Sequence, residues 1–74
     1  MNYTDDEKAV FEFLFELQDS GNTNTYGYAA YIIREPRFNH IGLILAEDLV
    51  LKWMTNYDKI KEEMACNTIV FIDT

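Results

Sequence analysis

The chain has 74 residues, of which 49% are hydrophobic and 15% aromatic, so it has enough apolar side chains for a core and is not expected to be disordered. Six Lys and Arg against thirteen Asp and Glu give a net charge of -7, which opposes binding to a polyanion such as DNA. A chain this short buries only about 60% of the surface that it exposes when unfolded, so we expect one domain that oligomerisation would help to stabilise.

The absence of a membrane span and of a signal peptide predicts a cytoplasmic protein. The sequence has neither the apolar run of about 18 residues that spans a membrane nor the basic and apolar segments of a signal peptide. Cys66 is the single cysteine and cannot form an internal disulfide, and one Cys with one His cannot supply the four ligands of a zinc site. We therefore expect no cofactor, no structural metal and no membrane partner.

The first predicted element is a helix over residues 4–20. Thr4 and Glu7 have the spacing of a capping box, in which each side chain accepts a hydrogen bond from the amide of the other residue. Gly21 ends the helix, because glycine adopts the left-handed conformation readily. Apolar residues at helical spacing predict a buried stripe, consisting of Val10, Phe13, Leu14 and Leu17 with Phe11 and Phe15 beside it. The opposite face is acidic and is either solvated or an anionic docking strip, formed by Glu12, Glu16 and Asp19.

A short second helix is predicted over residues 28–35. Pro36 stops it, because the residue before a proline disfavours the helical conformation. The alternative is a strand over residues 25–33, since this segment is rich in Tyr and Ile. Such a strand would form a β-α-β unit with the C-terminal segment, giving an α+β fold.

The main helix is predicted over residues 42–66, either continuous or broken near 56–58. Its buried stripe follows three- and four-residue spacings and consists of Ala46, Leu49, Val50, Trp53, Tyr57, Ile60 and Met64. Asp48 lies four residues before Lys52 and is expected to form an ion pair with it. Further aliphatic residues cannot all face the same core, and they form either a wide core stripe or a contact surface for another chain: Leu43, Ile44, Leu45 and Leu51.

A six-residue strand is predicted at residues 68–73, with the sequence TIVFID. A lone strand is unstable in water, so its side chains are candidate interface residues: Ile69, Val70, Phe71 and Ile72. Pairing with a second copy in a homodimer is the preferred interpretation, and packing as a tail on its own core is the alternative. The predicted fold is therefore mostly α, a compact three-helix domain of helix-turn-helix-like layout with a short C-terminal strand.

No motif for catalysis is present in the sequence. Gly21, Gly27 and Gly42 are too scattered for a phosphate-binding loop, and no Ser-His-acid arrangement has a recognisable context. His40 is interpreted as a turn residue and Cys66 as a small apolar side chain rather than as a base and a nucleophile. The chain is not expected to be an enzyme.

One loop and one helix carry a resemblance to a known group of proteins. The sequence GNTNTYG at residues 21–27 is followed by a short helix and then by a helix with Ala46, Leu49, Leu51, Trp53 and Met54. This pattern resembles small tailed-phage proteins that share a G-x-T-N-x-aromatic-G loop, a short helix and a final A-x-x-x-L-x-x-W-M helix. The resemblance covers residues 5–57 and implies a compact helix-turn-helix-type domain, with no activity or site residue to carry over. The start of the last helix departs from that pattern, because this chain has Leu43, Ile44 and Leu45 where polar residues are typical.

Three functional hypotheses follow from these features. The preferred one is a phage-encoded protein-interaction module, an adaptor or inhibitor in the cytoplasm of an infected cell, which binds a protein of unknown identity through an acidic and apolar surface. The second is a helix-turn-helix-type DNA-binding regulator that contacts phosphates through Arg34, Arg37 and Lys52. Its main helix begins with three aliphatic residues and two carboxylates, where a recognition helix has polar and basic side chains, and the net charge is -7, so nucleic acid is not an expected partner. The third is an acidic mimic of nucleic acid.

Overall fold

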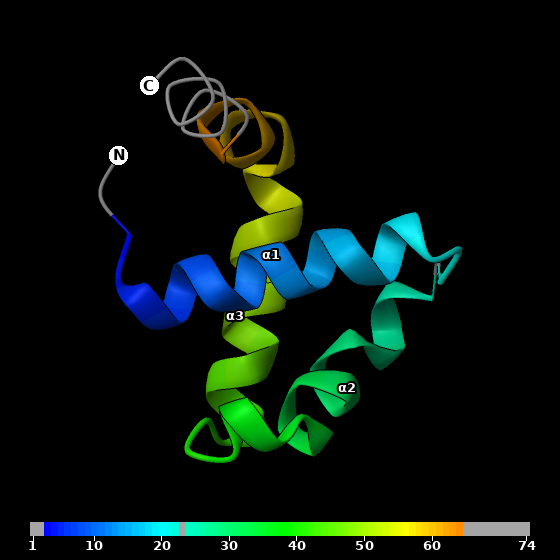
Figure 1. The fold of residues 1–74 in the computed structure, drawn as a ribbon, viewed down its shortest axis with the longest axis vertical. Helices are drawn as coiled ribbons and strands as arrows, with labels where there is room; N and C mark the ends of the chain where they lie inside the picture. Colours follow the sequence, from blue (N-terminus) through cyan, green and yellow to red (C-terminus); the bar gives the residue numbers. More distant parts are fainter. Residues whose placement is uncertain (1–2, 23, 65–74) are drawn as a thin grey trace.

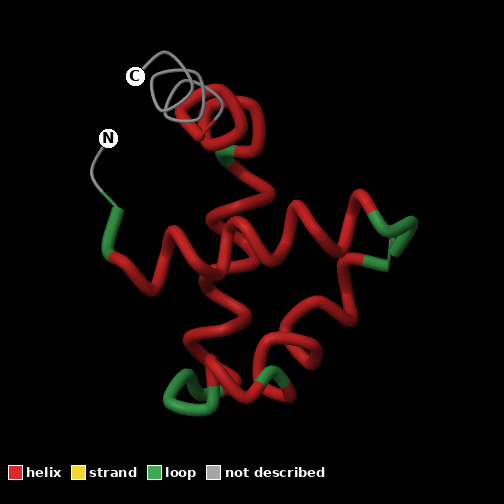
Figure 2. Tube along the Cα trace, viewed as in Figure 1, coloured by secondary structure: helices red, strands yellow, loops and turns green. Residues whose placement is uncertain are grey.

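The computed structural model describes residues 3–22 and 24–64, and this part of the chain is mostly helical, as predicted. Figure 2 shows helices joined by short loops, with no strand among these residues. The α-helices are α1 (Asp5–Asp19), α2 (Tyr28–Arg34), α3 (Leu43–Thr55) and a further segment at 57–64. Two 3₁₀ turns, η1 (Thr25–Gly27) and η2 (Pro36–Phe38), flank α2. None of the helices in the described residues is long and apolar enough to cross a membrane.

Both ends of α1 form as the sequence predicts. The Glu7 amide donates to Thr4 Oγ1 at 3.1 Å, and the Thr4 amide donates to Glu7 Oε1 at 2.9 Å, which completes the capping box. At the other end Gly21 has a φ of 94°, and its amide donates to the Gln18 carbonyl. This left-handed residue reverses the chain and satisfies a carbonyl at the end of the helix.

Residues 25–34 are helical, so the predicted alternative of a strand over 25–33 is wrong. The buried residues Tyr28, Ala29 and Ile32 show the three- and four-residue spacing of a helix rather than the two-residue spacing of a strand. Burying them on one side of a short helix outweighs the strand preference of Tyr and Ile. The chain turns before Pro36, and Glu35, which ends α2, is extended as expected for a residue before proline.

The main helix is interrupted at Asn56. The backbone amide and Nδ2 of Asn56 both donate to the Lys52 carbonyl, at 3.0 and 3.1 Å, which ends α3. The Asn56 carbonyl then accepts from the Ile60 amide at 2.9 Å and starts the segment 57–64. The predicted helix end at 66 and the predicted strand at 68–73 lie outside the described residues.

The core forms where α1 lies across α3 (Figure 1). The stripe predicted for α3 and the following segment is buried at Ala46, Leu49, Val50, Trp53 and Ile60 and partly buried at Tyr57 and Met64. Trp53 is the centre of an aromatic cluster, with ring centroids 5.3 Å from Phe15, 5.8 Å from Tyr28 and 5.1 Å from Tyr57. These tilted and edge-on contacts stabilise aromatic pairs beyond the area that they bury.

A charged contact joins α1 to α3 at the surface of this core. Lys52 Nζ lies 2.6 Å from Glu7 Oε2, and the Glu7 side chain is only 18% exposed. The predicted ion pair between Asp48 and Lys52 is therefore wrong, because the lysine turns to α1 instead. The capping box already fixes the Glu7 carboxylate, so Lys52 reaches a better ordered and less solvated partner there than at Asp48.

The start of the described chain packs beside its end. The Tyr3 ring contacts the Phe11 ring edge-on at 5.5 Å, and its hydroxyl lies against the Glu63 carboxylate. Burial, followed by the neighbouring Glu63 carboxylate, raises the pKa of Tyr3 to about 12. Tyr3 therefore links the beginning of α1 to the segment 57–64.

Candidate functional site

The candidate site is the exposed apolar surface of α3. The four aliphatic residues that the sequence singled out are all exposed: Leu43, Ile44, Leu45 and Leu51. Met54 is also exposed and extends this surface by one turn toward the end of α3. The predicted interface residues Ile69, Val70, Phe71 and Ile72 lie outside the described residues.

Helical geometry separates these side chains into two flanks of α3. Successive residues of a helix are rotated by about 100°, so Ile44 and Leu51, seven apart, share one direction. Leu43 and Met54 lie within about a quarter turn of them, on the side that faces the start of α2. Leu45 lies on the other flank, near Lys52. We call Leu43, Ile44, Leu51 and Met54 the α3 apolar face.

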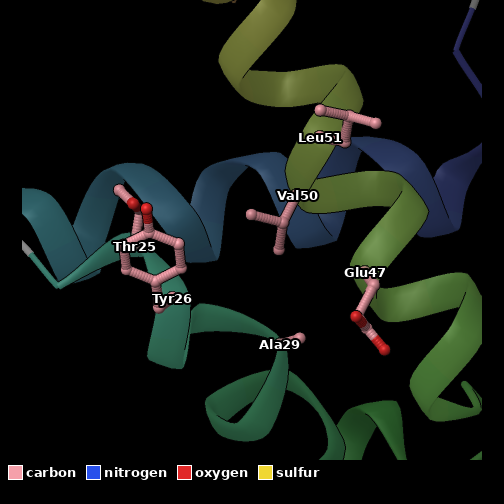
Figure 3. A pocket seen from close by; sticks show the side chains of 6 residues that line it. All are labelled: Thr25, Tyr26, Ala29, Glu47, Val50 and Leu51. Carbon is pink, nitrogen blue, oxygen red and sulfur yellow. The ribbon is translucent and has the colours of Figure 1, made fainter.

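A shallow groove lies beside the α3 apolar face, between α3 and the segment that contains η1 and the start of α2 (Figure 3). The residues that line it are Thr25, Tyr26, Ala29, Glu47, Val50 and Leu51. Val50 and Ala29 are buried, whereas Leu51 is 63% exposed. The groove encloses about 160 Å³, well below the roughly 300–1,000 Å³ of pockets that hold a small molecule. Its size suits a side chain of a larger partner.

Tyr26 is the most exposed large apolar side chain of the described residues, at 99%. Two hydrogen bonds connect residues on either side of Tyr26: the Tyr28 hydroxyl donates to the Asn22 carbonyl, and the Gly27 amide donates to the Asn24 carbonyl at 3.0 Å. The Tyr26 ring lies in solvent at the edge of the groove. Sequence reasoning did not select Tyr26 as a site residue, although the aromatic position of the GNTNTYG motif marks it.

Two carboxylates accompany the α3 apolar face. Glu47 lines the groove, and Asp48 lies one turn after Ile44 and one turn before Leu51. Both are exposed. Within the described part of the chain, neither forms an ion pair with a Lys, Arg or His side chain. The surface is thus apolar and negatively charged together.

The predicted acidic face of α1 is a different surface. Glu12, Glu16 and Asp19 are all exposed. Glu16 Oε2 lies 3.9 Å from Arg37 Nη2, so part of this charge is neutralised within the chain. An exposed pair of this kind contributes little to stability.

Two of the three predicted phosphate-contacting residues are engaged within the chain. Lys52 donates to Glu7, as described above. The Arg37 guanidinium lies over the rings of Phe13 and Phe38, at 5.4 and 4.9 Å from their centroids. Arg34 is exposed in the last turn of α2. Lys52 and Arg37 are therefore already partnered within the chain.

The described residues show no arrangement for metal binding, since no three His, Cys, Asp or Glu side chains among them lie close enough to hold an ion. His40 Nε2 lies 3.1 Å from Asp6 Oδ1, a contact that links the turn after η2 to the first turn of α1 and that the sequence did not predict. Both side chains are more than half exposed, so the contact is a surface pair. No family model, curated protein or solved structure matches this chain.

Proposed function

We propose that this chain is a non-enzymatic protein-interaction module that binds a partner protein through the α3 apolar face and the adjacent groove. The observation that carries the proposal is the exposure of Leu51 and Tyr26 on the two sides of a groove whose floor is already apolar. Contiguous exposed apolar surface of this kind marks binding sites in soluble proteins.

The energetics of such a contact favour a macromolecular partner. Burying a Leu or Tyr side chain completely contributes about 1.5–3 kcal/mol, and exposed aromatic residues beside a pocket are frequent anchors of protein interfaces. The groove floor of Val50 and Ala29 needs no rearrangement to receive a side chain, because both residues are held by the packing of α2 against α3. A partner would gain apolar burial without disturbing the core.

The resemblance to tailed-phage proteins makes a bacterial lysate the appropriate source of partners. We propose affinity capture with the tagged wild-type chain and with the variants Leu51→Ser and Leu45→Ser, followed by quantitative mass spectrometry. Leu45 is the matched control, since it is an exposed leucine of the same helix, 50% exposed, on the other flank. The proposal predicts a protein that is retained by the wild type and by Leu45→Ser and is lost with Leu51→Ser.

Two results would count against this function. Capture of the same proteins by all three chains would show that the α3 apolar face is not the binding surface. Absence of any protein above background in every arm would leave the module without a partner in that lysate and remove its support.

Homodimerisation through the predicted strand at 68–73 is a separate proposal, because that segment lies outside the described residues. Its support is the strand propensity of the sequence TIVFID. Sedimentation equilibrium of the full chain and of a Val70→Lys variant tests it. A dimer that becomes a monomer in the variant supports strand pairing, and a monomeric wild type at high concentration contradicts it.

A further inference from the structure

We infer that the groove and the adjoining α3 apolar face take a cationic amphipathic helix of a partner protein, with basic side chains placed opposite Glu47 in the groove and opposite Asp48 on the outer side of α3. This inference rests on the proposed function and adds the chemistry of the partner. It is carried by the position of the two carboxylates within the apolar surface.

The charge inside the groove comes from a single side chain. Glu47 is the only charged residue among the six that line it. A purely apolar partner segment would remove water from this carboxylate without replacing its hydrogen bonds, which opposes binding. A partner ammonium or guanidinium group would compensate for the lost water and fix the register of the segment.

The carboxylate of Asp48 is not neutralised by the lysine on its own helix. Lys52, the residue four positions along α3, is bound to Glu7 at 2.6 Å and does not neutralise Asp48. Asp48 lies between Ile44 and Leu51 on the outer side of α3, so a helix packed on these two residues passes over its carboxylate. Both acidic side chains of the surface are therefore available to cations from outside.

Charge complementarity decides between partners. A second copy placed face to face would add two further carboxylates, its own Glu47 and Asp48, to the interface, and each chain has a net charge of -7. An isologous contact pairs the same surface with itself, so it supplies no cation that this surface does not already have. A polyanion is repelled in the same way. A basic segment with leucine-like side chains one turn apart is the partner whose chemistry fits both the apolar residues and the carboxylates.

The test uses two designed amphipathic helical peptides with identical leucine positions, one with Lys and one with Glu at the polar positions. Binding to the full chain is measured by fluorescence anisotropy at physiological salt. The inference predicts that the Lys peptide binds at least about tenfold more tightly than the Glu peptide.

Matched variants separate a local effect from the overall charge. Glu47→Gln with Asp48→Asn and Glu12→Gln with Asp19→Asn each remove two negative charges, so both change the net charge from -7 to -5. We expect Glu47→Gln with Asp48→Asn to weaken binding of the Lys peptide about five- to tenfold. The control pair should weaken it less than about twofold. Equal losses in the two double variants, or equal binding of the Lys and Glu peptides, would overturn the inference.

The same samples distinguish this inference from the proposed function. If Leu51→Ser weakens binding of both peptides and the carboxylate variants leave binding unchanged, the docking surface is supported and the inference of a cationic partner is wrong. If Leu51→Ser leaves both peptides unaffected, the proposed docking surface itself is wrong. Sedimentation equilibrium tests whether a second copy occupies the groove. A wild-type dimer that becomes a monomer with Leu51→Ser would show that it does and would overturn the inference.

Discussion

Single residues with two partners hold this small domain together. Glu7 is the clearest case, because one carboxylate oxygen caps α1 and the other accepts from Lys52 on α3. The hydrogen bond from Lys52, the capping bond with Thr4 and the nearby positive charge lower the pKa of Glu7 below its ordinary value of 4.5. The sequence predicted the cap from the spacing of Thr4 and Glu7. It could not predict the contact with Lys52, because that contact depends on how α1 crosses α3.

The pH dependence of stability tests this contact. Because the pKa of Glu7 is lower in the folded state, its stabilisation is fully present above the ordinary pKa of 4.5 and is lost as the pH falls through the folded value. We expect Glu7→Gln to lower the free energy of unfolding by about 1 kcal/mol at neutral pH and by much less near about pH 2. Urea denaturation followed by Trp53 fluorescence measures both values, since Trp53 is the single tryptophan and is buried.

Glu12→Gln is the control for this measurement. Glu12 is exposed on the outer face of α1, so its replacement should change the free energy of unfolding by less than about 0.5 kcal/mol at either pH. If Glu7→Gln lowers the free energy of unfolding by the same amount at both pH values, the ionised carboxylate is not what stabilises the fold.

The backbone of the turn after α1 gives a second prediction at the residue scale. Gly21 has a φ of 94°, a conformation that an L side chain adopts only with strain. Gly27 has a φ of -91°, and a Cβ there would meet its neighbours at ordinary van der Waals distances. We therefore expect Gly21→Ala to destabilise the fold by about 1 kcal/mol or more, and Gly27→Ala to be neutral or to stabilise it by about 0.4–1 kcal/mol.

Thermal denaturation of the two variants, followed by circular dichroism, distinguishes them. The two changes add the same methyl group, and neither creates a steric clash, so a lower melting temperature of Gly21→Ala reports mainly on the left-handed backbone conformation. Equal melting temperatures would contradict the left-handed turn at Gly21.

At the scale of elements, α3 differs between its two sides. Its inner stripe of Ala46, Leu49, Val50 and Trp53 is buried, and sequence periodicity predicted each of these residues. Periodicity works here because a helix of this length places every third or fourth residue on the same side. The same argument identified Leu43, Ile44, Leu45 and Leu51 as surplus, and the structure exposes all of them.

Other features depended on tertiary contacts and were beyond sequence reasoning. The helical state of residues 25–34 is decided by the packing of Ala29 and Ile32 against α3, which overrides the strand propensity of that segment. The groove exists only because η1 and α2 lie beside α3, so neither Tyr26 nor the position of Glu47 was predicted as part of the site. The split of the aliphatic residues into two flanks follows from helical geometry once the buried side is known.

At the scale of the whole molecule, charge and apolar surface act together. A net charge of -7 opposes contact between like-charged surfaces and favours basic partners. Two of the described cations, Lys52 and Arg37, already contact carboxylates of the same chain. The α3 apolar face combines exposed apolar side chains with neighbouring carboxylates, and under our proposal this combination selects a basic and apolar protein segment.

The most direct test of docking through the α3 apolar face combines folding and binding in one variant, Leu43→Ser with Ile44→Ser. Both side chains are exposed, so the variant should keep its helical circular dichroism spectrum and change the free energy of unfolding by no more than about 0.5 kcal/mol per site. We predict that this folded variant loses the partner that the wild type captures. Unfolding of the variant would show that these residues belong to the core, and capture of the same partner by the folded variant would show that binding occurs elsewhere; either result contradicts the account.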